Sequence, residues 1–138
     1  MGKVRLCHPD DAGERNIRIL IVDDSRFARE LVIEIITEQG WSVVDQAQTG
    51  VEAVAKYRQH MPDLVVMDIN TPEMDGLSAL RMIKEQFPEA RVLMCTALGT
   101  SDNLKSALAL GASDFVVKPF LKERLVLAIK RAYRQRTE

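Results

Sequence analysis

Hydrophobic residues along the chain gather in five short runs, separated by longer stretches in which apolar residues recur at helical spacing. The runs lie at residues 17–22, 42–47, 64–67, 92–95 and 115–117. Four of them are almost continuously apolar, a pattern typical of strands that are covered on both faces. The run at 42–47 is more polar and predicts a weaker strand. We therefore predict five short strands.

Local signals place a helix after each run. Ser25 is suited to cap the first helix, which Gly40 stops, and the segment from Thr49 to Glu52 has the form of a capping box. The residues that recur at helical spacing in the first helix are Phe27, Leu31, Ile35 and Ile36. The later helices are predicted from Thr49 toward Met61, and at about 77–87, 102–110 and 121–134.

Five strands that alternate with five helices predict an α/β fold, a doubly wound five-stranded parallel sheet, because right-handed crossovers place helices on both of its faces. The 138 residues suffice for one domain at roughly 100–200 residues per domain. Residues 1–16 are mostly polar and aperiodic, so we predict a flexible arm at 1–16 and a folded domain at 17–136.

Composition and charge exclude several classes of protein. The chain is 46% hydrophobic and 28% charged, which is ordinary for a globular domain. Nineteen Lys and Arg against 20 Asp and Glu give a net charge of -1, so no basic field indicates a nucleic-acid partner, and the basic last helix is interpreted as a solvated face. No stretch nears the roughly 18 apolar residues of a membrane span. We expect a cytoplasmic protein without membrane insertion, in which Cys95 is a buried thiol.

Polar residues follow the predicted strands at the edge where ligands bind in such sheets. Asp23 and Asp24 follow the first strand, Asp68 the third, Thr96 the fourth and Lys118 the fifth. Three carboxylates brought together repel one another unless a cation lies between them. Mg²⁺ prefers such oxygen ligands, so the pattern predicts a magnesium site.

Other metal sites fit the sequence less well. His8 and His60 do not lie at strand ends, which leaves transition-metal chemistry unsupported. An EF-hand that starts at Asp68 fails because Pro72 and Ala79 occupy ligand positions.

The same edge is suited to phosphoryl chemistry. The Lys118 ammonium and the Thr96 hydroxyl, together with a metal ion, match the three oxygens of a phosphoryl group bound to a carboxylate. Asp68 is then a plausible nucleophile, since a metal can hold a carboxylate in line and neutralise the incoming charge.

In these residues the chain resembles the receiver domain of bacterial two-component response regulators, over about 17–134. The resemblance rests on Asp23-Asp24, on Asp68 within VVMDINTPEMDG, on Thr96-Ala97 and on Lys118-Pro119. The stretches VVMDINTPEMDG, MCTALG and DFVVKPF are most similar to free-standing chemotaxis-type (CheY-like) regulators. The resemblance implies the flavodoxin-like topology of receivers.

The resemblance also implies a role for each acidic residue. Asp68 is expected to accept the phosphoryl group, Asp24 to ligate Mg²⁺ directly, and Asp23 to act largely through a metal-bound water. Asn70 is expected to offer its backbone carbonyl to the metal.

The resemblance further implies a switch. Thr96 and Lys118 are expected to contact the phosphoryl oxygens, and Phe115 to be the switch aromatic whose rotamer follows Thr96. The Lys118-Pro119 bond is expected to be cis. The chain departs from many relatives at Thr71, where a Met is common, and at Phe115, which lacks a tyrosine hydroxyl. Leu98 lies at a position that influences dephosphorylation in the family.

The function implied is that of a phosphorylation-switched signalling protein. A histidine kinase donates the phosphoryl group to Asp68, and the chain catalyses only its own phosphorylation and dephosphorylation. A downstream protein is expected at the surface of the fourth helix, fifth strand and fifth helix, near Lys105, Phe115 and Lys122. Three alternatives stay open: a receiver cut from a larger regulator, a metal-dependent phosphohydrolase and a flavodoxin-like mononucleotide binder.

Overall fold

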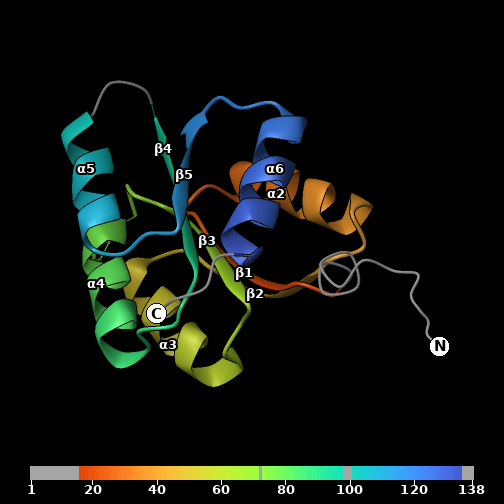
Figure 1. The fold of residues 1–138 in the computed structure, drawn as a ribbon. Helices are drawn as coiled ribbons and strands as arrows, with labels where there is room; N and C mark the ends of the chain where they lie inside the picture. Colours follow the sequence, from red (N-terminus) through yellow and green to blue (C-terminus); the bar gives the residue numbers. More distant parts are fainter. Residues whose placement is uncertain (1–15, 72, 98–100, 135–138) are drawn as a thin grey trace.

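The computed structural model describes residues 16–71, 73–97 and 101–134 and contains the predicted alternation of strands and helices (Figure 1). Its strands are β1 (Arg18–Val22), β2 (Ser42–Ala47), β3 (Leu64–Asp68), β4 (Val92–Ala97) and β5 (Asp114–Lys118). Its helices are α2 (Arg26–Glu38), α3 (Gly50–His60), α4 (Gly76–Gln86), α5 (Ser101–Ala109) and α6 (Lys122–Arg134). The predicted boundaries agree with these to within about two residues at most ends.

All neighbouring strands of the sheet pair in parallel, in the order β2-β1-β3-β4-β5. The predicted doubly wound, flavodoxin-like fold is confirmed. The order brings the carboxyl ends of β1, β3, β4 and β5 side by side, which is the edge that carries the predicted chemistry. The expected arm at 1–16 lies outside the described residues except for Asn16.

The sheet separates two hydrophobic cores. Successive strand residues point to opposite faces, so Ile19 and Ile21 of β1 belong to one core, and Leu20 and Val22 to the other. Figure 1 shows α2 and α6 on one face of the sheet and α3, α4 and α5 on the other. Among the helices of the described ranges, none has the length and hydropathy of a membrane span.

Side-chain caps start the helices at the predicted positions. The Ser25 hydroxyl accepts a hydrogen bond from the Ala28 N–H, and the Thr49 hydroxyl accepts one from the Glu52 N–H. The capping box differs from its usual form, because the Glu52 carboxylate accepts from the N–H of Gln48 instead of that of Thr49.

Helix α2 buries only part of its large apolar residues: Ile36 lies in the core and Ile35 packs against it, but Phe27 and Leu31 are exposed. Its buried residues are Arg29, Val32 and Ile36. Phe27 is 72% exposed and Leu31 is 48% exposed. The helical spacing of apolar residues therefore predicts the helix, but Phe27 and Leu31 form part of the surface near the candidate site.

Candidate functional site

Three carboxylates meet at the carboxyl edge of the sheet, as the sequence predicts. Asp23 and Asp24 follow β1, and Asp68 is the last residue of β3. Each offers a carboxylate oxygen, and these three oxygens all lie within 4.8 Å of one another. Asp23 is 6% exposed and Asp68 is 9% exposed, whereas Asp24 is open to solvent.

Lys118 lies between two of these carboxylates. Its Nζ is 2.7 Å from Asp23 Oδ2 and 3.2 Å from Asp68 Oδ2. Burial lowers the pKa of Lys118, but the hydrogen bond to Asp23 and the negative charge of Asp68 outweigh this effect and raise the pKa above its ordinary value. The ammonium therefore stays charged and offsets part of the repulsion between the carboxylates. The bond between Lys118 and Pro119 is cis, as expected.

The Asp68 side chain is oriented by the loop that follows it. Its Oδ1 accepts the N–H of Asn70 at 3.0 Å. The start of α4 packs directly against this segment, because a Cβ on Gly76 would lie 2.4 Å from the Asp68 carbonyl oxygen and 2.7 Å from Ile69 Cα. The absence of a Cβ at Gly76 therefore allows the backbone at the start of α4 to lie against that of Asp68 and Ile69. Asn70 itself is exposed.

A second set of contacts fixes the far side of the same loop, and sequence reasoning did not identify it. The buried Thr71 side chain donates from Oγ1 to the Met74 carbonyl at 2.9 Å. That carbonyl lies so close to Gly50 that a Cβ there would be 1.9 Å from the oxygen. Met74 has φ 136, in the region that favours glycine. The loop after Asp68 therefore packs directly against the start of α3.

Arg29 forms hydrogen bonds to the backbone of the acidic edge, and sequence reasoning did not identify it either. It is 7% exposed, and its Nη1 donates to the Asp23 carbonyl at 2.7 Å. Its Nε donates to Gln46 Oε1 at 2.8 Å. The Asp23 carboxylate in turn accepts the N–H of Ser25 at 2.9 Å. The turn between β1 and α2 is held at both backbone and side chain.

The predicted switch residues lie on neighbouring strands. Thr96 is 1% exposed and its hydroxyl donates to the Ala97 carbonyl at 3.2 Å. Phe115 is half-buried and packs against the core on the side of α3, α4 and α5. Cys95 is buried as predicted, and burial raises the pKa of its thiol to about 12. Leu98 lies outside the described residues.

An apolar pocket of about 560 Å³ opens beside the acidic edge. It lies between α2 and the segment after β5, and Asp23, Asp68 and Lys118 contribute to its wall. Most of its lining is apolar and includes Phe27 and Leu31. Sequence reasoning did not identify this pocket, because spacing alone does not show which apolar face of a helix stays exposed.

The donor set fits a hard divalent cation. Carboxylate oxygens that share a small volume beside exposed Asp24 suit a cation that keeps several waters. The described residues place no His or Cys among the three carboxylates. The arrangement can hold such a cation and present the Asp68 carboxylate beside it.

Comparison with known proteins gives one consistent result. The family model described as response regulator receiver domain matches residues 19–130. The chain is 47% identical over 114 residues to the chemotaxis protein CheY of Bacillus subtilis (strain 168), covering 83% of this chain and 95% of the relative. It is 43% identical over 114 residues to CheY of Thermotoga maritima, with the same coverage.

A solved structure agrees with these relatives. The crystal structure of the CheX-CheY-BeF3-Mg+2 complex from Borrelia burgdorferi contains a chain that superposes with a TM-score of 0.83 at 37% identity, covering 86% of this chain and 90% of that one.

Proposed function

The chain belongs to the response regulator receiver family and is a CheY-like signalling protein, and we propose that Asp68 is the residue that accepts its phosphoryl group. The observation that carries this assignment is the convergence of Asp23, Asp24, Asp68 and Lys118 at one edge of the sheet. Apart from this chemistry on its own side chain, the protein is not an enzyme.

We propose Mg²⁺ as the cation of this site. Asp24 and Asp68 would ligate it directly, Asp23 largely through water, and Asn70 through its backbone carbonyl. The metal supplies charge neutralisation for the incoming phosphoryl group. The solved Borrelia relative contains Mg²⁺ with BeF3, which supports this choice.

The reaction proposed is transfer from a phosphohistidine of a histidine kinase. An oxygen of the Asp68 carboxylate attacks phosphorus, the P–N bond breaks, and the imidazole leaves. Asn70 N–H orients the carboxylate, while Lys118 stabilises the negative phosphoryl oxygens at the end of β5. Thr96 would contribute its hydroxyl to the same oxygens once it leaves the Ala97 carbonyl.

The apolar pocket beside Asp68 is the proposed docking surface for the phosphodonor. Phe27 is 72% exposed and Leu31 is 48% exposed, both line this pocket, and large apolar side chains left in water beside a reactive carboxylate favour a protein contact. A donor protein seated there would also exclude water from Asp68 during transfer.

The downstream partner is proposed to bind the surface of α5, β5 and α6. Phosphorylation changes the charge beside Thr96 and biases the position of Phe115, which shares the Thr96 face of the sheet, between two states. Lys105 and Lys122 are exposed on this surface. On phosphorylation, we expect backbone NMR shifts to change across α5 and β5; shifts confined to Asp68 and its loop would contradict the proposed route.

The two remaining functional classes fit less well. A mononucleotide binder needs free amides in the first strand-to-helix turn, but Ser25 N–H is bound to Asp23 and Ala28 N–H to Ser25. A phosphohydrolase needs a general acid in addition to the carboxylates that hold the metal, and position 70, which could have supplied it, carries Asn. Family membership favours signalling over both.

The test is phosphorylation by acetyl phosphate with Mg²⁺, followed by intact mass. One added phosphoryl group is expected on the parent chain, none on Asp68→Asn, and none on the parent after Mg²⁺ is chelated. Labelling of Asp68→Asn at the parent level would refute the assignment.

Asp75→Asn is the matched control. Asp75 is an exposed carboxylate in the same loop region, and it caps α4 by accepting the Ser78 N–H at 2.8 Å. Asn caps helices as well as Asp does, so this variant should fold and be labelled like the parent. Equal loss in both variants would show that the effect is not specific to Asp68.

A further inference from the structure

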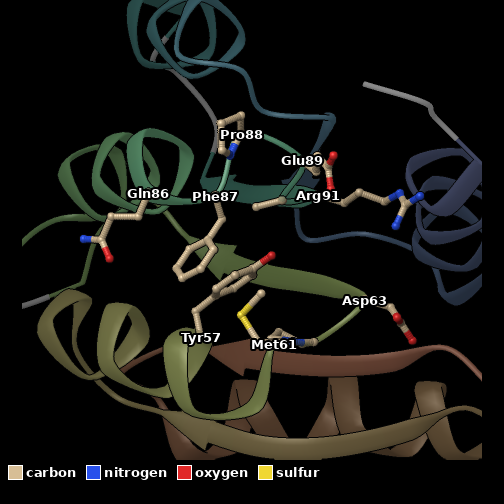
Figure 2. Close-up of a pocket in the computed structure, with 10 residues that line it drawn as sticks. Tyr57, Met61, Asp63, Gln86, Phe87, Pro88, Glu89 and Arg91 are labelled. Atoms are coloured by element: carbon tan, nitrogen blue, oxygen red, sulfur yellow. The ribbon is translucent and has the colours of Figure 1, made fainter. Parts of the chain in front are cut away.

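A second pocket lies at the opposite edge of the sheet from Asp68. It has a volume of about 570 Å³ and is formed where α3 and α4 end and where β3 and β4 begin (Figure 2). Because β3 spans five residues, roughly 15 Å of strand separates this pocket from the phosphoacceptor edge. It is therefore distinct from the site described above.

One wall of the pocket is rigid and aromatic. The Tyr57 and Phe87 rings pack with centroids 5.1 Å apart, tilted by 41°. The segment after Phe87 is fastened by the Lys84 ammonium, which donates to the Pro88 carbonyl at 2.6 Å and to the Ala90 carbonyl at 3.0 Å. A preformed apolar wall of this kind is typical of small-molecule sites.

The Tyr57 hydroxyl is buried without a hydrogen-bond partner among the residues that the structure describes. Tyr57 is only 4% exposed. Its phenol oxygen points away from α3 and into the pocket in Figure 2. Burial raises the pKa of Tyr57, so the hydroxyl keeps its proton and can donate. Because no described residue accepts from it, the hydroxyl can donate to a molecule in the pocket.

Met61 provides the opposite wall in a strained conformation. It ends α3 with φ 46, a position that glycine usually occupies. The Arg18 guanidinium holds the turn by donating to the carbonyls of His60 and Met61. The Met61 side chain is 50% exposed and lines the pocket. Retained strain at a flexible apolar side chain is typical of a binding surface.

Two of the three charged residues that line the pocket, Asp63 and Arg91, have partners outside it, and the third, Glu89, is an exposed residue of the rim. The Arg91 guanidinium lies 5.2 Å from the centre of the Tyr133 ring, and the Asp63 carboxylate accepts the N–H of Arg18 at 2.8 Å. Figure 2 shows both side chains extending away from the Tyr57 and Phe87 rings. Between the charged rim residues, the pocket offers the Phe87 ring, the Met61 thioether and the Tyr57 hydroxyl.

We propose that this pocket binds a small, uncharged aromatic compound that carries a hydrogen-bond acceptor, with its ring against Phe87 and Met61 and its acceptor at the Tyr57 hydroxyl. The binding does not require Mg²⁺ or phosphorylation of Asp68.

Benzamide is the probe, and its charged relatives benzamidine and benzoate are the comparisons. In a ¹⁵N NMR titration of the full chain without Mg²⁺, benzamide should give saturable shifts centred on the amides of Tyr57, Met61 and Ala90. Benzamidine and benzoate should bind more weakly. Shifts centred near Asp68, no saturable shifts, or tighter binding of either charged compound would overturn the proposal.

Two variants separate binding from folding. Tyr57→Phe removes the unsatisfied hydroxyl and Met61→Gly removes the strain, so both should keep or raise the melting temperature. Both should weaken benzamide binding, Tyr57→Phe by about three- to ten-fold, the equivalent of one hydrogen bond.

Tyr133→Phe is the matched control, since Tyr133 does not line the pocket, and it should bind like the parent. If Tyr57→Phe binds benzamide as tightly as the parent does, the proposal is overturned. A melting temperature of Tyr57→Phe below that of the parent would in that case assign the hydroxyl a structural role.

Discussion

Thr71 shows at the scale of a single residue how a hydroxyl can set the position of the loop after Asp68. Its hydrogen bond to the Met74 carbonyl closes the loop that begins with Asn70. Thr71→Val keeps the shape of the side chain and removes the bond. We expect Mg²⁺ affinity to fall about five-fold, the equivalent of about 1 kcal/mol.

Calorimetric titration of Mg²⁺ checks this expectation, and Thr71→Ser is the control because it restores the hydroxyl. Recovery of affinity in the Ser variant supports a positioning role. If the Val variant binds Mg²⁺ as tightly as the parent chain does, the loop is held by other contacts.

Single residues also show where sequence reasoning succeeds. Asp23, Asp68 and Lys118 could be predicted together because each follows an apolar run, and parallel topology brings strand ends to one edge. Arg29 could not, because a charged residue on a helix is normally solvated. Its burial depends on a carbonyl at Asp23 and an amide at Gln46, which meet only in the folded chain.

At the scale of elements, the contact between the start of α3 and the loop after β3 depends on Gly50. An added Cβ would lie 1.9 Å from the Met74 carbonyl oxygen, a clash with backbone that cannot move cheaply. Gly50→Ala should therefore destabilise the fold by about 3 kcal/mol and weaken Mg²⁺ binding. Urea unfolding and Mg²⁺ titration measure the two effects.

Gly40→Ala is the matched comparison. Gly40 has φ 84 but nothing within 4 Å of its added Cβ, so the substitution adds only backbone strain of about 1 kcal/mol. It should leave Mg²⁺ binding unchanged. Equal effects of the two substitutions on Mg²⁺ binding would show that the α3 contact does not position the site.

Three charged or titratable side chains connect β2 with α3, and their contribution to stability depends on pH: Asp45 of β2 contacts Lys56 and His60 of α3. Burial raises the pKa of Asp45, but the Gln46 N–H and the side chains of His60 and Lys56 lower it more, so the pKa lies below its ordinary 3.8. A carboxyl whose pKa is lower in the folded state stabilises the fold at pH values above the pKa of the unfolded state. This stability is lost as the pH falls through the pKa of the folded state.

Asp45→Asn should therefore cost about 0.5–1 kcal/mol at pH 6, a modest amount because the Asp45 side chain is 32% exposed. The difference from the parent should shrink as the pH falls below 3.8. Thermal unfolding across pH 6 to 3 measures it, and a constant difference would show that the Asp45 charge is not the cause.

At the scale of the whole molecule, the fold was predictable because the hydrophobic pattern and the helix caps predict the same order of strands and helices. Buried strands such as β1 and β3 are apolar on both faces, and caps such as Ser25 mark the helices between them. The two pockets described above were not predictable from the sequence. Each is formed by side chains from several elements, and the exposed face of Phe27 or the burial of Tyr57 depends on how those elements pack.

The charge balance at the acidic edge couples the site to the stability of the whole chain. Lys118 offsets the carboxylates of Asp23 and Asp68 when no metal is bound. Lys118→Met leaves those carboxylates without their cation, and we expect it to destabilise the chain by about 2 kcal/mol in the presence of a chelator, less than for a fully buried pair because the Lys118 side chain is 29% exposed.

Saturating Mg²⁺ should reverse part of this loss, because a cation that binds only the folded state stabilises it in proportion to its affinity. The Mg²⁺-induced rise in melting temperature should therefore be larger in Lys118→Met than in the parent chain. Asp24→Asn, which removes one proposed ligand without touching the Lys118 pairs, should show a smaller rise than the parent. An equal rise in all three chains would mean that the carboxylates and Lys118 do not share one ion site.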